Sequence, residues 1–113
     1  MASSTVADDV FRALSDPTRR KVLERLSKGP ASVSELAKPF DMKLPSFVQH
    51  LAILEHSRLV TSIKKGRVRV FEINPQRLKV VEDWLAQQRR LWETRLDQLD
   101  EYLLKLKQQE ENK

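Results

Sequence analysis

The last third of the sequence constrains the fold more than any other part. From Gln76 onwards it contains neither glycine nor proline, which predicts one helix of about 35 residues and about 50 Å at 1.5 Å per residue. A chain of 113 residues builds only one modest core, so a helix of this length needs a partner outside its own domain. Its apolar residues repeat every seven positions, as in a coiled-coil seam, at Leu78, Leu85, Trp92, Leu99 and Leu106.

This long helix is predicted to mediate dimerisation. Val81 and Tyr102 occupy the second core position of the repeat, and the apolar face is broad enough for the N-terminal helix to take part. Two alternatives stay open: the helix folds back on its own core, or Trp84 and Trp92 line an effector pocket. The predicted dimer interface comprises Val6, Val10, Phe11, Leu78, Val81, Leu85, Trp92, Leu99, Tyr102 and Leu106.

Composition and charge narrow the class of protein. The chain is 40% hydrophobic and 33% charged, has no cysteine, and starts without the basic and apolar regions of a signal peptide. No apolar run approaches the length of about 18 residues that spans a membrane, so we expect a cytoplasmic protein without a membrane partner. The net charge of +5 arises in residues 1–74, with thirteen Lys and Arg against eight Asp and Glu, because residues 75–113 carry eight of each. The basic part is expected to meet a polyanion.

The first 74 residues predict helices followed by a hairpin. Asp16 and Pro17 have the spacing of a helix N-cap and first turn, and Ser32 and Glu35 have capping-box spacing. β-Branched residues on both sides of "KKG" predict a hairpin. The predicted elements are a helix from about Ser4 to Leu14, a helix from Asp16 to Gly29, a short helix that stops before Pro39, a helix from about Leu44 to His56, and a hairpin from about Leu59 to Ile73.

Two short helices joined by a tight turn and followed by a basic hairpin are typical of a winged helix-turn-helix, whose second helix enters the major groove of DNA. The predicted fold class is therefore mainly α with a small β-hairpin and a long C-terminal dimerisation helix. On a helical wheel the inward face of the second helix carries Phe47, His50, Leu51, Ile53 and Leu54. Its outward face carries Leu44, Pro45, Val48, Gln49 and Ala52.

The outward face suits base edges, since apolar groups contact thymine methyls and glutamine pairs with adenine. Alternatively, it packs on a neighbouring loop or subunit. Four of the six residues from Lys64 to Arg69 are basic, which favours contact with phosphate or the minor groove, although such residues also protect exposed strand edges. The predicted DNA-binding residues are Lys43, Leu44, Pro45, Ser46, Val48, Gln49, His50, Lys64, Lys65, Arg67 and Arg69.

Three stretches together resemble the ArsR (ArsR/SmtB-like) type of bacterial winged-helix repressor over about residues 6–75: "FRALSDPTRRKVLERL", "SVSELAKPFDMKLPSFVQHLAILEHSRLV" and "KKGRVRVFEI". The resemblance implies a homodimer that binds an operator in double-stranded DNA and leaves it when a signal arrives. We expect a DNA-binding domain in residues 1–74 and a dimerisation helix in residues 75–113, as one continuous structural unit. Lys43, Asp41 and Val48 depart from residues that are common in the family. We therefore expect this chain to dock on DNA as the family does, but not to share the family's base preferences.

Many proteins of this type sense metals through cysteine thiolates or His and carboxylate clusters. This chain has no thiol, and its two histidines, His50 and His56, point about 240° apart on one helix and cannot share an ion. We therefore expect a member that does not sense metal, without cofactor or catalytic residues, and leave open an unknown small-molecule effector. The rival hypothesis is a winged-helix scaffold that binds proteins through the exposed apolar helix and assembles through the long one.

Overall fold

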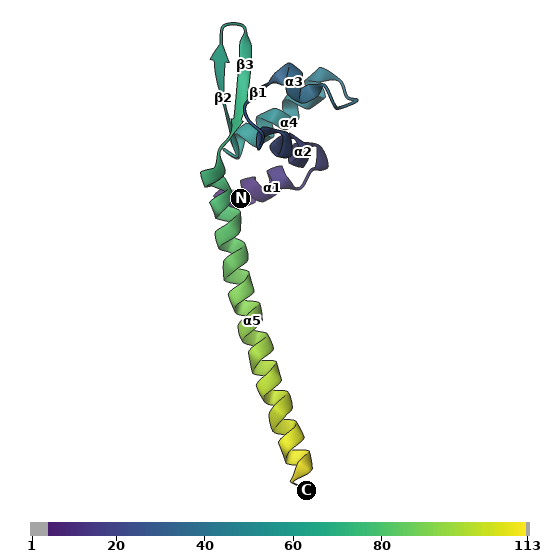
Figure 1. Cartoon of the computed structure of the whole chain (residues 1–113), viewed down its shortest axis with the longest axis vertical. Coiled ribbons are helices and arrows are strands. Elements are labelled where there is room, and N and C mark those ends of the chain that lie inside the picture. Colours follow the sequence, from purple (N-terminus) through teal and green to yellow (C-terminus); the bar gives the residue numbers. More distant parts are fainter. Residues whose placement is uncertain (1–4, 113) are drawn as a thin grey trace. The chain divides into compact units, whose positions relative to one another are not determined.

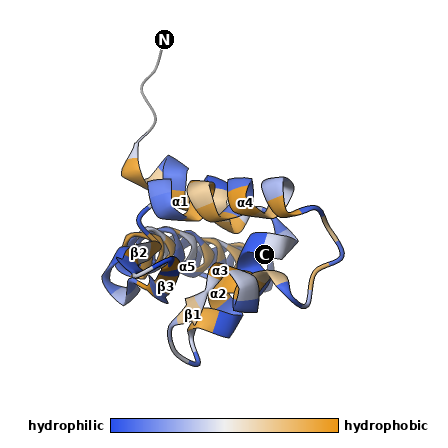
Figure 2. Ribbon diagram, turned by 90° about the horizontal axis from the view of Figure 1, so that it is seen from above, coloured by the Kyte–Doolittle hydropathy of each residue, from blue (hydrophilic) through white to orange (hydrophobic). Residues whose placement is uncertain are grey.

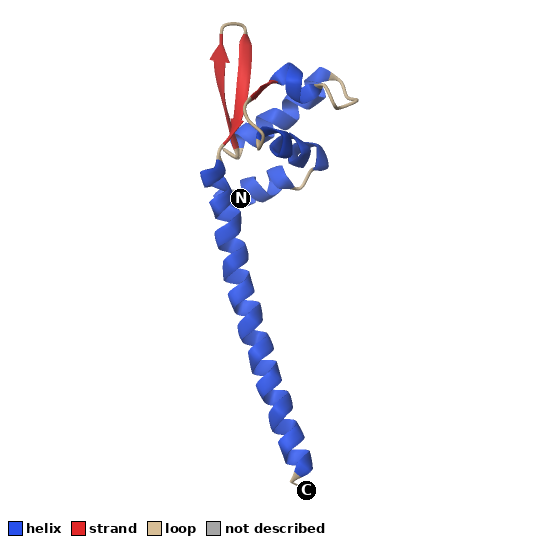
Figure 3. Cartoon of the chain, in the orientation of Figure 1, coloured by secondary structure: helices blue, strands red, loops and turns tan. Residues whose placement is uncertain are grey.

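The computed structural model describes residues 5–112. They fall into two compact units that divide between Val81 and Glu82. The elements shown in Figures 1 and 3 are α1 (Val6–Leu14), α2 (Pro17–Leu26), β1 (Ala31–Ser32), α3 (Val33–Ala37), α4 (Leu44–His56), β2 (Val60–Lys65), β3 (Val68–Ile73) and α5 (Pro75–Glu111).

Helices α1, α2 and α3 begin where side chains satisfy their first backbone N–H groups. The Asp16 side chain accepts a hydrogen bond from the Arg19 backbone N–H at 3.1 Å, and Ser32 and Glu35 form a reciprocal capping box at the start of α3. Both predicted caps are confirmed. Helix α1 is capped by Thr5, and the predicted start at Ser4 lies outside the described residues.

The three strands form one antiparallel sheet in the order β1-β3-β2. Strands β2 and β3 pair from Val60 opposite Ile73 to Lys65 opposite Val68, so the predicted hairpin is confirmed. The sequence did not predict β1, which pairs Ser32 with Val70, because a two-residue strand is too short to show an alternating pattern. Ser32 thus belongs to the sheet and caps α3 as well.

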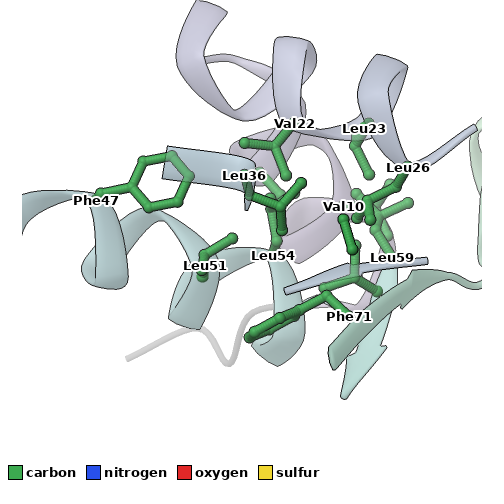
Figure 4. Close-up of a cluster of buried hydrophobic side chains, with 13 residues drawn as sticks. Val10, Val22, Leu23, Leu26, Leu36, Phe47, Leu51, Leu54, Leu59 and Phe71 are labelled. Atoms are coloured by element: carbon green, nitrogen blue, oxygen red, sulfur yellow. The ribbon is translucent and has the colours of Figure 1, made fainter. Parts of the chain in front are cut away.

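The core of the first unit collects apolar side chains from all four of its short helices and from the sheet, and Figure 4 shows ten of them labelled. Figure 2 shows α1 and α4 side by side with hydrophobic residues on both. The predicted inward residues Phe47, Leu51 and Leu54 of α4 are buried, as are Val22, Leu23 and Leu26 of α2.

One predicted interface residue belongs to this core instead. Val10 has no exposed surface, because α1 turns it toward the interior of its own domain, and we therefore remove it from the predicted dimer interface. Leu78 and Val81, in the first turns of α5, are half-buried against the same core. Val6 is half exposed and Phe11 is partly buried.

The second unit is a single helical segment, the continuation of α5 from Glu82 to Glu111. Along residues 82–111 the structure buries no side chain. Its exposed large apolar residues are Trp84, Leu85, Leu91, Trp92, Leu96, Leu99, Tyr102, Leu103, Leu104 and Leu106. Within the part of the chain that the structure describes, no helix has the length and apolar character needed to cross a membrane.

Candidate nucleic-acid interface

Helix α4 presents an apolar face to solvent. Leu44 is 55% exposed and Val48 is 45% exposed, and Pro45, Gln49 and Ala52 are exposed beside them. This confirms the outward face that the helical wheel predicted. Methyl and methylene groups with one amide form a surface that matches thymine methyls and the edge of adenine.

The start of α4 leaves backbone donors free for an anion. Lys43 occupies the N-cap position, no side chain of the described residues caps the helix, and the first turn contains no acidic residue. The positive end of the helix dipole and the N–H groups of the first turn favour a phosphate at this position. Lys43 and Ser46 are exposed beside these donors.

The wing, residues 60–73, brings its cations to the same region. Lys64, Lys65, Arg67 and Arg69 are all exposed around the turn at Gly66, whose φ of 64° is in the left-handed region. Arg67 and Val68 of the wing, Leu44 of α4 and the Ser32–Ser34 segment line one shallow depression of about 270 Å³. The wing tip and the start of α4 therefore lie next to each other on one surface.

A chain of polar contacts fixes the wing against α4. Arg69 donates from its Nη1 to Ser62 Oγ at 2.9 Å, and Ser62 Oγ donates to the Glu55 carboxylate near the end of α4. Lys64 lies opposite Arg69 on the neighbouring strand. Arg69 therefore uses one donor to orient the wing and keeps its remaining donors for a ligand.

His50 does not lie on the exposed face. Its side chain is 22% exposed, its Nδ1 lies 3.1 Å from the guanidinium of Arg19, and the same atom lies 3.7 Å from Asp16. The prediction that His50 contacts DNA is therefore corrected: its ring points toward α2, in agreement with its inward position on the helical wheel.

Arg19 connects three helices. It is 8% exposed and donates to the carbonyl oxygens of Ala13 at 2.8 Å and Arg12 at 2.9 Å, at the end of α1. Burial raises the pKa of Asp16, but the hydrogen bond from the Arg19 N–H and the charges of His50 and Arg19 outweigh this effect and lower it below its usual value. This network was not predicted from the sequence. The signal was present, because Arg19 falls on the inner stripe of α2 one turn before Val22 and Leu23.

Comparison with known proteins identifies the family. A family model described as a helix-turn-helix domain matches residues 14–63. The transcriptional regulator Rv2034 of Mycobacterium tuberculosis is 39% identical over 75 residues, which are 66% of this chain and 70% of that protein. A crystal structure of an ArsR family transcriptional regulator is 55% identical with a TM-score of 0.76, and covers 79% of this chain and 98% of that one. The chain belongs to the ArsR family.

Other relatives agree with this assignment. The transcriptional repressor SdpR of Bacillus subtilis is 33% identical over 78 residues, which are 69% of this chain and 87% of SdpR. An ArsR-like transcriptional regulator from Rhodococcus sp. RHA1 is 30% identical with a TM-score of 0.72, and covers 83% of this chain and 89% of that one. This ArsR-family protein is thus a winged helix-turn-helix transcriptional regulator that binds DNA.

Across residues 5–112 of this regulator, no three His, Asp or Glu side chains gather in a group suited to a metal ion. His56, the second histidine, is exposed and lies 3.8 Å from Asp9 of α1. The two histidines thus contact different acidic residues.

Proposed function

We propose that the protein is a homodimeric, sequence-specific repressor that acts in the cytoplasm and has no enzymatic activity. One observation carries the proposal: the exposed face of α4, its uncapped start and the basic wing adjoin one another, with Leu44 and Arg67 lining the same depression. In this arrangement α4 enters the major groove, and its first turn and the wing contact phosphates on either side.

The proposed roles follow the chemistry of each side chain. Leu44, Pro45, Val48 and Gln49 face base edges, and the other proposed residues contact the sugar-phosphate backbone. His50 positions α4 through Arg19 and is not among the contacts. The backbone contacts are Lys43, Ser46, Lys64, Lys65, Arg67 and Arg69.

Residues 1–74 are proposed to form the DNA-binding domain and residues 75–113 the dimerisation helix. Burying the exposed seam of α5 against a second copy removes a large apolar surface from water. A dimer also gives useful specificity, because one recognition helix contacts only a few base pairs and two half-sites lie about 34–36 Å apart. The proposed interface consists of Val6, Phe11, Leu78, Val81, Leu85, Trp92, Leu99, Tyr102 and Leu106.

Titration of duplex DNA at several salt concentrations tests the proposal. Each neutralised phosphate contributes about −0.9 to the slope of log K against log salt. Changing both Lys65 and Arg67 to Ala removes two cations per subunit and should flatten the slope by roughly two to four units in a dimer.

The matched control changes Lys105 and Lys107, two exposed cations of α5, to Ala and should leave the slope within one unit. An unchanged slope in the wing variant would mean that the wing cations only protect a strand edge. Binding to protein partners with no measurable affinity for any duplex would instead support the scaffold hypothesis, which rests on the exposed Leu44 and Val48.

A further inference from the structure

A second concave site lies on the face of the first unit between α2 and the segment that follows α3. It has a volume of about 400 Å³, within the range of about 300–1,000 Å³ that is usual for small-molecule pockets. None of the proposed DNA or dimer contacts lines it. The lining residues are Lys21, Val22, Glu24, Arg25, Lys28, Leu36, Pro39 and Phe40.

The lining separates into an apolar floor and a cationic rim. Val22 is 0% and Leu36 1% exposed, so the apolar surface open to a ligand comes from the partly buried Phe40, which packs against the same core, and the exposed Pro39. Figure 4 shows Val22 of α2 and Leu36 of α3 within that cluster. A pocket with such a floor takes an apolar body that carries a few polar groups.

The rim is richer in cations than in carboxylates. The lining contains three cationic residues, Lys21, Arg25 and Lys28, and one carboxylate, Glu24. Arg25 is partly neutralised by Glu35 at 3.6 Å and donates to the Gly29 carbonyl at 3.1 Å. Neither lysine forms an ion pair with any residue that the structure describes. Their charges are available to an anion.

Phe40 connects this pocket to the recognition helix. Its ring centroid lies 5.3 Å from that of Phe47, which has no exposed surface and anchors α4 in the core. A molecule that packs on Phe40 therefore contacts a side chain that lies directly against Phe47, the residue that anchors the first turn of α4. Interiors are close-packed and transmit such displacements.

We propose that this pocket binds an amphipathic organic anion, a compact aromatic or aliphatic body with one carboxylate or sulfonate. The apolar body lies on Pro39 and Phe40, above the buried Val22 and Leu36, and the anionic group lies between Lys21 and Lys28. Occupancy is transmitted to α4 through the contact between Phe40 and Phe47. The ligand is thus an effector of the regulator.

The probe for the test is anilinonaphthalene sulfonate, which fluoresces in an apolar site, and phenylnaphthylamine is its uncharged counterpart. Changing Lys21 and Lys28 to Gln in the full chain should weaken the anionic probe by at least about fivefold and leave the neutral probe within twofold, since only the charge of the rim changes. The control variant, with Lys105 and Lys107 changed to Gln, should bind both probes as the native protein does.

Amide chemical shifts locate the bound probe and show whether α4 responds. The largest changes should fall on residues 21–28 and 36–40, with a smaller change at Phe47. Changes concentrated on residues 84–106, or equal affinity of native and lysine variants for the anionic probe, would overturn the proposal. The proposal would also be overturned if the lysine variants bound the probe unchanged but lost DNA affinity and its salt dependence. The two lysines would then be phosphate contacts. The probe titration contains no DNA, so its failure would leave the proposed DNA binding intact.

Discussion

Replacing Arg19 by Met should destabilise the first unit, although the substitution keeps an unbranched apolar stem. Arg19 is 8% exposed, and its guanidinium donates to two carbonyl oxygens at the end of α1 and contacts His50 of α4. Methionine fills much of the same space but donates nothing. The Ala13 carbonyl then loses its partner inside the domain.

The expected loss follows from these contacts. A hydrogen bond from a charged donor contributes about 1.5–3 kcal/mol. The Arg12 carbonyl is partly compensated, because it also accepts from the Ser15 N–H at 3.2 Å and from Ser15 Oγ at 2.7 Å. Removing a buried charge returns some of its desolvation cost. The free energy of unfolding should therefore fall by about 2–3 kcal/mol, a large part of the roughly 5–15 kcal/mol of a typical domain.

Urea unfolding at one fixed protein concentration measures this loss, because the stability of a dimer depends on concentration. The matched control is Arg20→Met, since Arg20 is the next residue, is exposed, and donates to the Leu14 carbonyl at 2.8 Å. Its loss should stay below about 1 kcal/mol. Equal losses in the two variants, with unchanged m-values, would refute the structural role of the buried guanidinium.

Three further predictions concern other elements. Trp92→Asp should give a monomer by sedimentation, with near-native helix content and operator affinity about a hundredfold lower. Thr94→Asp, on the opposite side of the same helical turns, should stay dimeric. If the Trp92→Asp variant were dimeric, the proposed seam would be excluded as the dimer interface. Ser32→Ala should lower the free energy of unfolding in urea by about 1–2 kcal/mol, because Ser32 caps α3, and Ser34→Ala should lower it much less. Equal losses in the two variants would contradict the role of the cap. The difference in unfolding free energy between the native protein and Asp16→Ala should be largest above the usual pKa of aspartate and should shrink as pH falls through the lowered pKa of Asp16 in the folded state. A difference that grows in acid would contradict the lowered pKa.

Local signals in the sequence predicted much of the fold. The start and end of α4, Leu44 and His56, were predicted correctly because Pro45 sets the first turn and the apolar spacing is regular. The hairpin followed from β-branched residues on both sides of a glycine. These features depend on residues that are close in the sequence, so periodicity and turn chemistry reveal them.

Contacts between distant residues were not predictable in this way. Strand β1 forms because Ala31 pairs with Phe71, forty positions away. The His50 ring points toward α2 because Arg19 lies beside it. Val10 fits the pattern of an interface residue and of a core residue equally well, since periodicity shows which residues share a face but not what covers that face. The pocket at Phe40 depends on how α2 and the end of α3 meet, and no single segment encodes it.

Ser32 has a consequence for how this protein can change in evolution. Because it pairs with Val70 in the sheet and caps α3, a shift of one residue in the middle of the hairpin, where Val70 lies opposite Ile63, would disturb the strand pairing and the start of α3 together. At the tip, by contrast, space around Gly66 is open within 4 Å. Insertions and deletions are therefore better tolerated at the tip than in the paired part of the hairpin, so the length of the wing can diversify among descendants while the helix-turn-helix keeps its geometry.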